Sequence, residues 1–154
     1  MNINPNNWSC LPTAFANVIG VPVGLIIQQI GHDGSSKPFP EPYSDTPVGF
    51  HSQECIEVLD SSGWKVTCIE LYPRSYPMPG CPSIERMGDP KDRLKRHMSL
   101  DNGVLCGILK EEIGHAVSWI NGKIHDPRGC GLVWTPENFL YKHFDPRLFF
   151  KVRR

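Results

Sequence analysis

Residues 114–127 read GHAVSWINGKIHDP and contain the clearest structural signal in the chain. Asn121-Gly122 is the strongest short signal for a two-residue β-hairpin, so the runs on either side of it are predicted to pair as antiparallel strands. In the register that this turn sets, Asp126 is a diagonal neighbour of His115 on the same face of the sheet. The hairpin therefore brings a carboxylate within reach of an imidazole.

The remaining pattern predicts helices in the first part of the chain and strands in the second. Apolar residues at helical spacing, with glycine or proline at the ends, predict helices at 10–20, 23–31, 51–63 (capped by Ser52), 89–103 and 135–143 (capped by Thr135). Strands are predicted at 64–72, 104–110, 115–120, 123–127, 131–134 and 147–152. The proline-rich runs 32–50 and 73–83 are predicted to be loops, and they are candidates to border a substrate groove. The expected class is α+β, with N-terminal helices packed on a C-terminal antiparallel β-sheet in a single domain, 1–154.

Charge and hydropathy exclude several classes of partner. The 154 residues carry 16 basic and 16 acidic side chains, so no net charge attracts the whole molecule to nucleic acid or to a membrane surface. The longest apolar run, 18–27, is interrupted by Pro22 and two glycines and is too short to span a bilayer. The N-terminus does not have the pattern of a signal peptide. A cytoplasmic protein is expected, and the sequence does not indicate its oligomeric state.

Six cysteines are spread along the chain, at positions 10, 55, 68, 81, 106 and 130. No C-x-x-C pair occurs, and structural zinc ligands usually come in closely spaced pairs. Without an export signal, free thiols in a reducing compartment are expected. No metal and no cofactor are expected, although a zinc-binding structural domain stays as an alternative.

Cys10 stands at the predicted start of the first helix, directly before its apolar stripe. Unpaired N–H groups and the helix dipole at such a position favour a thiolate. The backbone N–H of Cys10 is also a candidate oxyanion donor. His115 is the candidate base, and Asp126 is the candidate group that orients its ring.

The other histidines are weaker candidates. Alternation along the strand sends His125 to the face opposite Asp126. The remaining four lie on predicted helices or loops, at positions 32, 51, 97 and 143.

Two segments resemble papain-like cysteine peptidases, and especially the branch related to double-glycine leader peptidases. The opening NPNNWSCLPTAFANVIG (4–20) is similar to the segment around that family's nucleophile. The run GHAVSWINGKIHDPRG (114–129) is similar to the family's Gly-His strand, turn and Asp-Pro. The resemblance covers about the first 30 residues and 103–130, and implies a papain-like fold.

The resemblance also implies roles for four residues. Cys10 would be the nucleophile, His115 the general base and acid, and Asp126 the orienting carboxylate. Asn4 occupies the place of the family's oxyanion glutamine, six residues before the cysteine, and provides the same amide on a shorter arm. Asn6 and Asn7 are nearby competitors for that role, and Leu11 replaces a glycine that many relatives carry after the nucleophile.

These features predict a cysteine peptidase that hydrolyses a peptide or isopeptide bond through an acyl-enzyme, with a protein or peptide as substrate. A catalytically silent binding module on the same fold is the main alternative. A transglutaminase, deamidase or acyltransferase would use the same triad with another acceptor. A small domain of this kind suits a bacterium or a phage.

Overall fold

The computed structural model describes residues 1–35, 49–73 and 87–154. Most of both proline-rich runs, including Cys81, lies outside the described residues. The helices are α1 (Cys10–Ile19), α2 (Val23–Ile30), α3 (Ser52–Ser61), α4 (Pro90–Leu100) and α5 (Pro136–Phe139). The strands are β1 (Lys65–Glu70), β2 (Gly103–Leu109), β3 (Gly114–Ile120), β4 (Lys123–His125), β5 (Val133–Trp134) and β6 (Phe144–Arg153).

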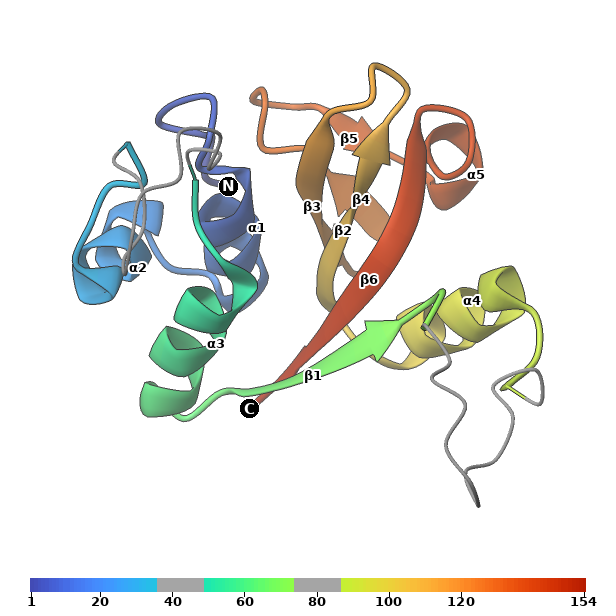
Figure 1. The fold of residues 1–154 in the computed structure, drawn as a ribbon, viewed down its shortest axis with the longest axis horizontal. Helices are drawn as coiled ribbons and strands as arrows, with labels where there is room; N and C mark the ends of the chain where they lie inside the picture. Colours follow the sequence, from blue (N-terminus) through green and yellow to red (C-terminus); the bar gives the residue numbers. More distant parts are fainter. Residues whose placement is uncertain (36–48, 74–86) are drawn as a thin grey trace.

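The described strands form one six-stranded sheet in the order β1-β6-β2-β3-β4-β5, and every pair of neighbours is antiparallel (Figure 1). The α+β class and the antiparallel sheet are confirmed. The helices lie toward the N-terminus and the sheet toward the C-terminus as expected, and the strand predicted at 64–72 is β1, which lies between α3 and α4 in sequence. It joins the sheet at the edge, beside the last strand.

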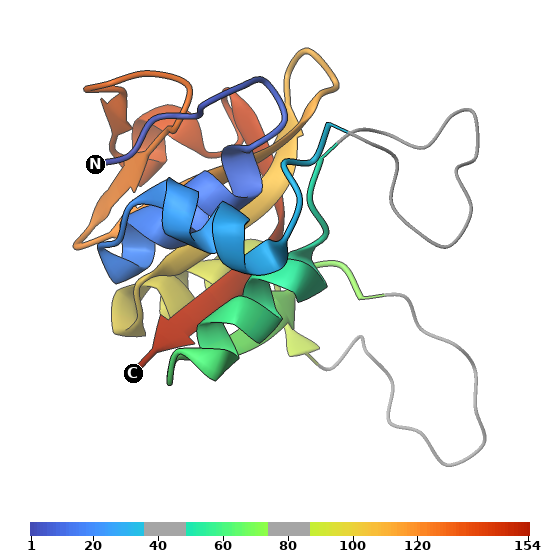
Figure 2. The same cartoon turned by 90° about the vertical axis from the view of Figure 1, so that its left-hand side faces the viewer.

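Helices cover both faces of this sheet. Alternate residues of a strand point to opposite faces, and Val104 and Ala116 pack in a cluster with side chains of α1, α2 and α3. Figure 2 shows these three helices together on one side of the sheet. Their neighbours Leu105 and Val117 belong to a second cluster, which includes side chains of α4 and α5.

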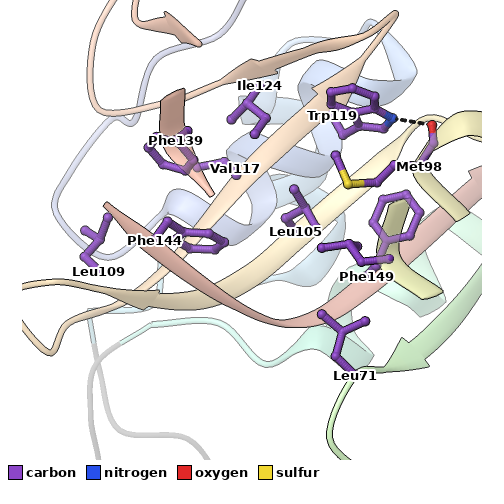
Figure 3. Packing of buried hydrophobic residues seen from close by; sticks show 11 residues of the cluster. Leu71, Met98, Leu105, Leu109, Val117, Trp119, Ile124, Phe139, Phe144 and Phe149 are labelled. Atoms are coloured by element: carbon purple, nitrogen blue, oxygen red, sulfur yellow. Dashed lines mark hydrogen bonds between the residues drawn. The ribbon is translucent and has the colours of Figure 1, made fainter. Parts of the chain in front are cut away.

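The second cluster is the more aromatic of the two (Figure 3). It contains Phe139 from α5 stacked against Phe144 from β6, with ring centroids 5.3 Å apart. Trp119 of β3 donates its indole N–H to the carbonyl of Met98 on α4 at 2.8 Å. This bond satisfies the polar atom of a buried tryptophan and fixes α4 against the sheet.

The predicted hairpin is confirmed. Asn121 and Gly122 have φ of 50° and 81°, which is the left-handed conformation that a type I′ turn requires at both positions. The register pairs Ile120 with Lys123 and Ser118 with His125. Asp126 follows this ladder directly.

The first helix begins at Cys10 as predicted, while the third differs in its cap. His51, not Ser52, occupies the N-cap of α3: its Nδ1 accepts a hydrogen bond from the backbone N–H of Gln53, and the Glu54 side chain accepts one from the backbone N–H of His51. An imidazole nitrogen replaces the hydroxyl oxygen that usually serves at this position. Thr135 and Pro136 lie where predicted at the start of α5, although the Thr135 side chain forms no capping hydrogen bond.

Candidate active site

The start of α1 places Cys10 at the end of the molecule where β3 also begins, the upper end in Figures 1 and 2. A local network sets the start of this helix. The side-chain oxygen of Asn6 accepts hydrogen bonds from the backbone N–H of Trp8 at 3.1 Å and from the Ser9 hydroxyl at 2.6 Å. The Ser9 carbonyl then accepts the hydroxyl of Thr13 at 2.6 Å. Cys10 follows as the first helical residue and is half-buried.

His115 is the second residue of β3 and is 8% exposed. Its Nε2 lies 2.9 Å from Oδ1 of Asp126, so the diagonal contact predicted from the turn is confirmed. A carboxylate is only an acceptor, which requires that Nε2 carries the proton and donates it. The neutral ring then has its lone pair on Nδ1.

The Cys10 side chain also interacts with the His115 ring and contributes to raising its pKa. Burial opposes a charged imidazole, but the hydrogen bond with Asp126 and the interaction with Cys10 outweigh it and raise the pKa of His115 above its ordinary value. The structure thus brings three of the predicted site residues together, with the imidazole of His115 between the thiol of Cys10 and the carboxylate of Asp126.

A buried hydrogen bond keeps the helix and the strand of this site in register. The Ser118 hydroxyl of β3 donates to the backbone carbonyl of Ala14 in α1 at 3.0 Å, and Ser118 is fully buried. Since Cys10 is one helical turn before Ala14 and His115 is three residues before Ser118, this contact fixes the relative position of the elements that carry them.

Arg128 is a further residue of the site that the sequence analysis missed. Its guanidinium binds both carboxylate oxygens of Asp126, with Nη2 2.6 Å from Oδ2. The Asp126 side chain is completely buried. Burial favours the neutral acid, but hydrogen bonds from His115 and Arg128 outweigh it, so the pKa of Asp126 is held well below its ordinary value. The carboxylate is therefore ionised wherever the protein is folded near neutral pH.

Asn4 lies beside the same loop. Its backbone N–H donates to the carbonyl of Pro127 at 2.8 Å, and its side-chain Oδ1 is buried without a hydrogen-bond partner among the described residues. The side-chain oxygen of Asn6 already accepts hydrogen bonds from Trp8 and Ser9 at the start of α1, and Asn7 is exposed. Of the three candidate amides, Asn4 is the one whose backbone is fixed against the loop that carries Asp126.

The segment that carries Asn4 is tied to α1 by hydrogen bonds between Asn2 and Asn17. The Asn2 side chain donates to the carbonyl of Val21 at 2.7 Å and accepts the backbone N–H of Val23 at 3.0 Å. The Asn17 side chain in turn donates to the backbone carbonyl of Asn2 at 3.2 Å. These bonds hold Asn2 against the end of α1 and the start of α2.

The other predicted candidates have separate positions. His32 forms a pair with Glu54 at 2.6 Å and stacks on Phe50, and His143 packs against Trp134 with the two rings tilted. Burial raises the pKa of the Cys55 thiol to about 12, so this cysteine is unreactive near neutral pH.

The described residues contain neither a cluster of metal ligands nor a membrane-spanning helix. In 1–35, 49–73 and 87–154, no three His, Cys, Asp or Glu side chains lie together as metal ligands would. Over the same ranges, no helix has the length and apolar character that a membrane crossing requires.

Comparisons with known proteins do not assign the chain to a family. No protein-family model matches the chain, and a search of curated proteins finds no significant match. The geometry of the site therefore provides the argument for function.

Proposed function

We propose that the chain is a cysteine peptidase of the papain-like class, a thiol hydrolase acting on peptide or isopeptide bonds of a protein or peptide substrate. The observation that carries this proposal is the 2.9 Å contact between His115 Nε2 and the buried Asp126 carboxylate, with the Cys10 side chain interacting with the same ring. A nucleophile, a base and an orienting group in that order are the parts that acyl transfer requires.

In the proposed reaction, Cys10 Sγ attacks the substrate carbonyl carbon while His115 accepts the thiol proton. The carbonyl electrons move to oxygen, and the oxyanion is stabilised by the backbone N–H of Cys10 and the side-chain amide of Asn4. The C–N bond then breaks, and His115 returns the proton to the leaving amine. Water, deprotonated by His115, hydrolyses the thioester and releases the acid and the free thiol.

A direct test compares the reactivity of the thiols. Iodoacetamide is expected to alkylate Cys10 faster than the exposed Cys68 and Cys130, and His115→Gln should abolish the difference. Mass spectrometry of tryptic peptides gives the rate at each position. Equal rates at the three cysteines in the unmodified protein would contradict the activated nucleophile.

The substrate test uses a library of peptides and ubiquitin-like conjugates beside a Cys10→Ala control. Hydrolysis by the unmodified chain alone supports the peptidase. With a primary amine added, a product that carries the amine in place of the acid would identify an acyltransferase on the same triad. If Cys10 reacts selectively but no substrate turns over, and Cys10→Ala keeps the affinity for a partner, the silent binding module is the better description.

A further inference from the structure

The Asp126 carboxylate is saturated with donors, and Arg128 provides most of them. Its Oδ1 accepts from His115 Nε2 at 2.9 Å, from the Arg128 backbone N–H at 3.0 Å and from Arg128 Nε at 3.1 Å. Its Oδ2 accepts from Arg128 Nε at 2.9 Å and Nη2 at 2.6 Å. Rotation of the carboxylate would break several of these bonds at once.

The Asp126 and Arg128 side chains differ in exposure, and this difference shows how the buried carboxylate is neutralised. The Asp126 side chain is 0% exposed, while that of Arg128 is 44% exposed. A buried carboxylate needs a counter-charge, and burying a second ion with it would add a further desolvation penalty. Arg128 supplies the charge while much of its side chain stays exposed, and the negative charge of Glu111 further favours the charged guanidinium.

The chain contains its own comparison, because the tripeptide Asp-Pro-Arg occurs twice. We use the term site copy for residues 126–128 and the term strand copy for residues 145–147. In the strand copy, Arg147 Nη2 donates to Asp145 Oδ2 at 2.7 Å, and both side chains are nearly half exposed. The bidentate grip and the burial are features of the site copy, so the local sequence alone does not create them.

The geometry points to Arg128 as a positioning residue: its guanidinium holds the Asp126 carboxylate in the orientation in which Oδ1 faces His115. The consequence for catalysis rests on the function proposed above. The orientation itself does not, because it concerns hydrogen bonds within the folded chain. Arginine suits this role because its planar fork binds two carboxylate oxygens at once, which a lysine ammonium does not.

The experiment follows the proton on His115 Nε2 by nuclear magnetic resonance in the full chain. In the unmodified protein this proton and the Nε–H of Arg128 should both exchange slowly with water, whereas the Nε–H of Arg147 should exchange fast. Arg128→Gln and Arg128→Lys are both expected to speed exchange at His115, since neither residue restores the fork. Arg147→Gln is the matched control and should leave the His115 proton unchanged.

The outcomes separate this proposal from the proposed function. Faster exchange at His115 in both Arg128 variants, with an otherwise native amide spectrum, supports the positioning role even if no substrate is ever found. Where hydrolysis is measurable, kcat should fall about tenfold or more with little change in KM, as part of the roughly 10²–10⁴-fold contribution of acid–base catalysis. An unchanged exchange rate of the His115 proton in Arg128→Lys, or fast exchange at Arg128 Nε–H in the unmodified chain, would overturn the proposal. Neither result would contradict the proposed roles of Cys10, His115 and Asp126.

Discussion

The site copy and the strand copy have the same three residues and different tasks. In the site copy, Asp126 is buried and bonded to an imidazole and to a guanidinium. In the strand copy, Asp145 lies inside β6, half exposed and opposite Ile108 of β2. What differs is the neighbourhood that the fold brings to each copy. The same short motif therefore acquires a chemical role only where the fold surrounds it with suitable neighbours.

The proline of each copy also serves a different purpose. Pro127 offers its carbonyl to the backbone N–H of Asn4, so the loop that orients the base also holds the N-terminal segment. Pro146 lies opposite Gly107, where the register between β2 and β6 shifts. A proline has no N–H for a ladder, and an irregularity in the pairing tolerates it. The site copy thus connects parts of the site, and the strand copy shapes the sheet.

The largest expected difference between the copies comes from removing each carboxylate charge. Asp126→Asn should lower the free energy of unfolding by about 3–5 kcal/mol, because it removes the negative charge of a buried ion pair and leaves its positive partner without a counter-charge. Asp145→Asn should lower it by about 1 kcal/mol or less, because the pair is exposed. Urea denaturation at pH 7 measures both. Similar losses in the two variants would show that burial does not distinguish the copies.

Local signals were enough to predict the hairpin and the pair of residues it brings together. The Asn121-Gly122 turn fixes the register by its own backbone geometry, so the contact between His115 and Asp126 follows from a few adjacent residues. The start of α1 at Cys10 is local too. These predictions depend on short sequence separations, where propensity and turn chemistry decide the structure.

Contacts between distant segments were not predictable in the same way. The bond from Ser118 to Ala14 joins residues 104 positions apart, and the pairing of β1 with β6 joins strands from different parts of the chain. Arg128 was missed because the tripeptide Asp-Pro-Arg occurs twice, and the tripeptide alone does not indicate which copy buries its carboxylate. The papain-like fold, the oxyanion role of Asn4 and the reaction itself remain predictions.

A second test compares the glycine beside each copy. A Cβ added at Gly107 would lie 2.2 Å from the backbone carbonyl oxygen of Asp145, and a backbone atom cannot move away without shifting β6. At Gly129 the nearest atom is Leu132 Cδ1 at 3.0 Å, the end of a flexible side chain. Gly107→Ala should therefore cost about 1–3 kcal/mol, the usual range for overpacking, and Gly129→Ala clearly less. Thermal unfolding ranks the two, and an equal or larger loss in Gly129→Ala would mean that the loop of the site copy is the more tightly packed region.

The smallest expected effect is a dependence on pH, because it involves one proton. The pKa of His115 is raised: burial lowers it, but the hydrogen bond with Asp126 and the interaction with Cys10 prevail. The stability that this shift provides is complete below the ordinary histidine pKa of about 6.5 and is lost as pH rises through the raised value. The stability deficit of His115→Gln should therefore be larger at acidic pH than at alkaline pH. Asp126 stays ionised across this range because its own pKa is lowered.

His125, the residue directly before the site copy, is a control with the opposite sign. Burial, with the charges of Lys123 and the N-terminus, lowers the pKa of His125. Folding therefore disfavours its protonation, and the unmodified chain loses stability on this account as pH falls through the ordinary value. The deficit of His125→Gln should shrink at acidic pH while that of His115→Gln grows. Urea denaturation of both variants from pH 5.5 to 9 measures the two slopes, and a His115→Gln deficit that does not grow at acidic pH would mean that the carboxylate of the site copy does not stabilise the charged form of His115.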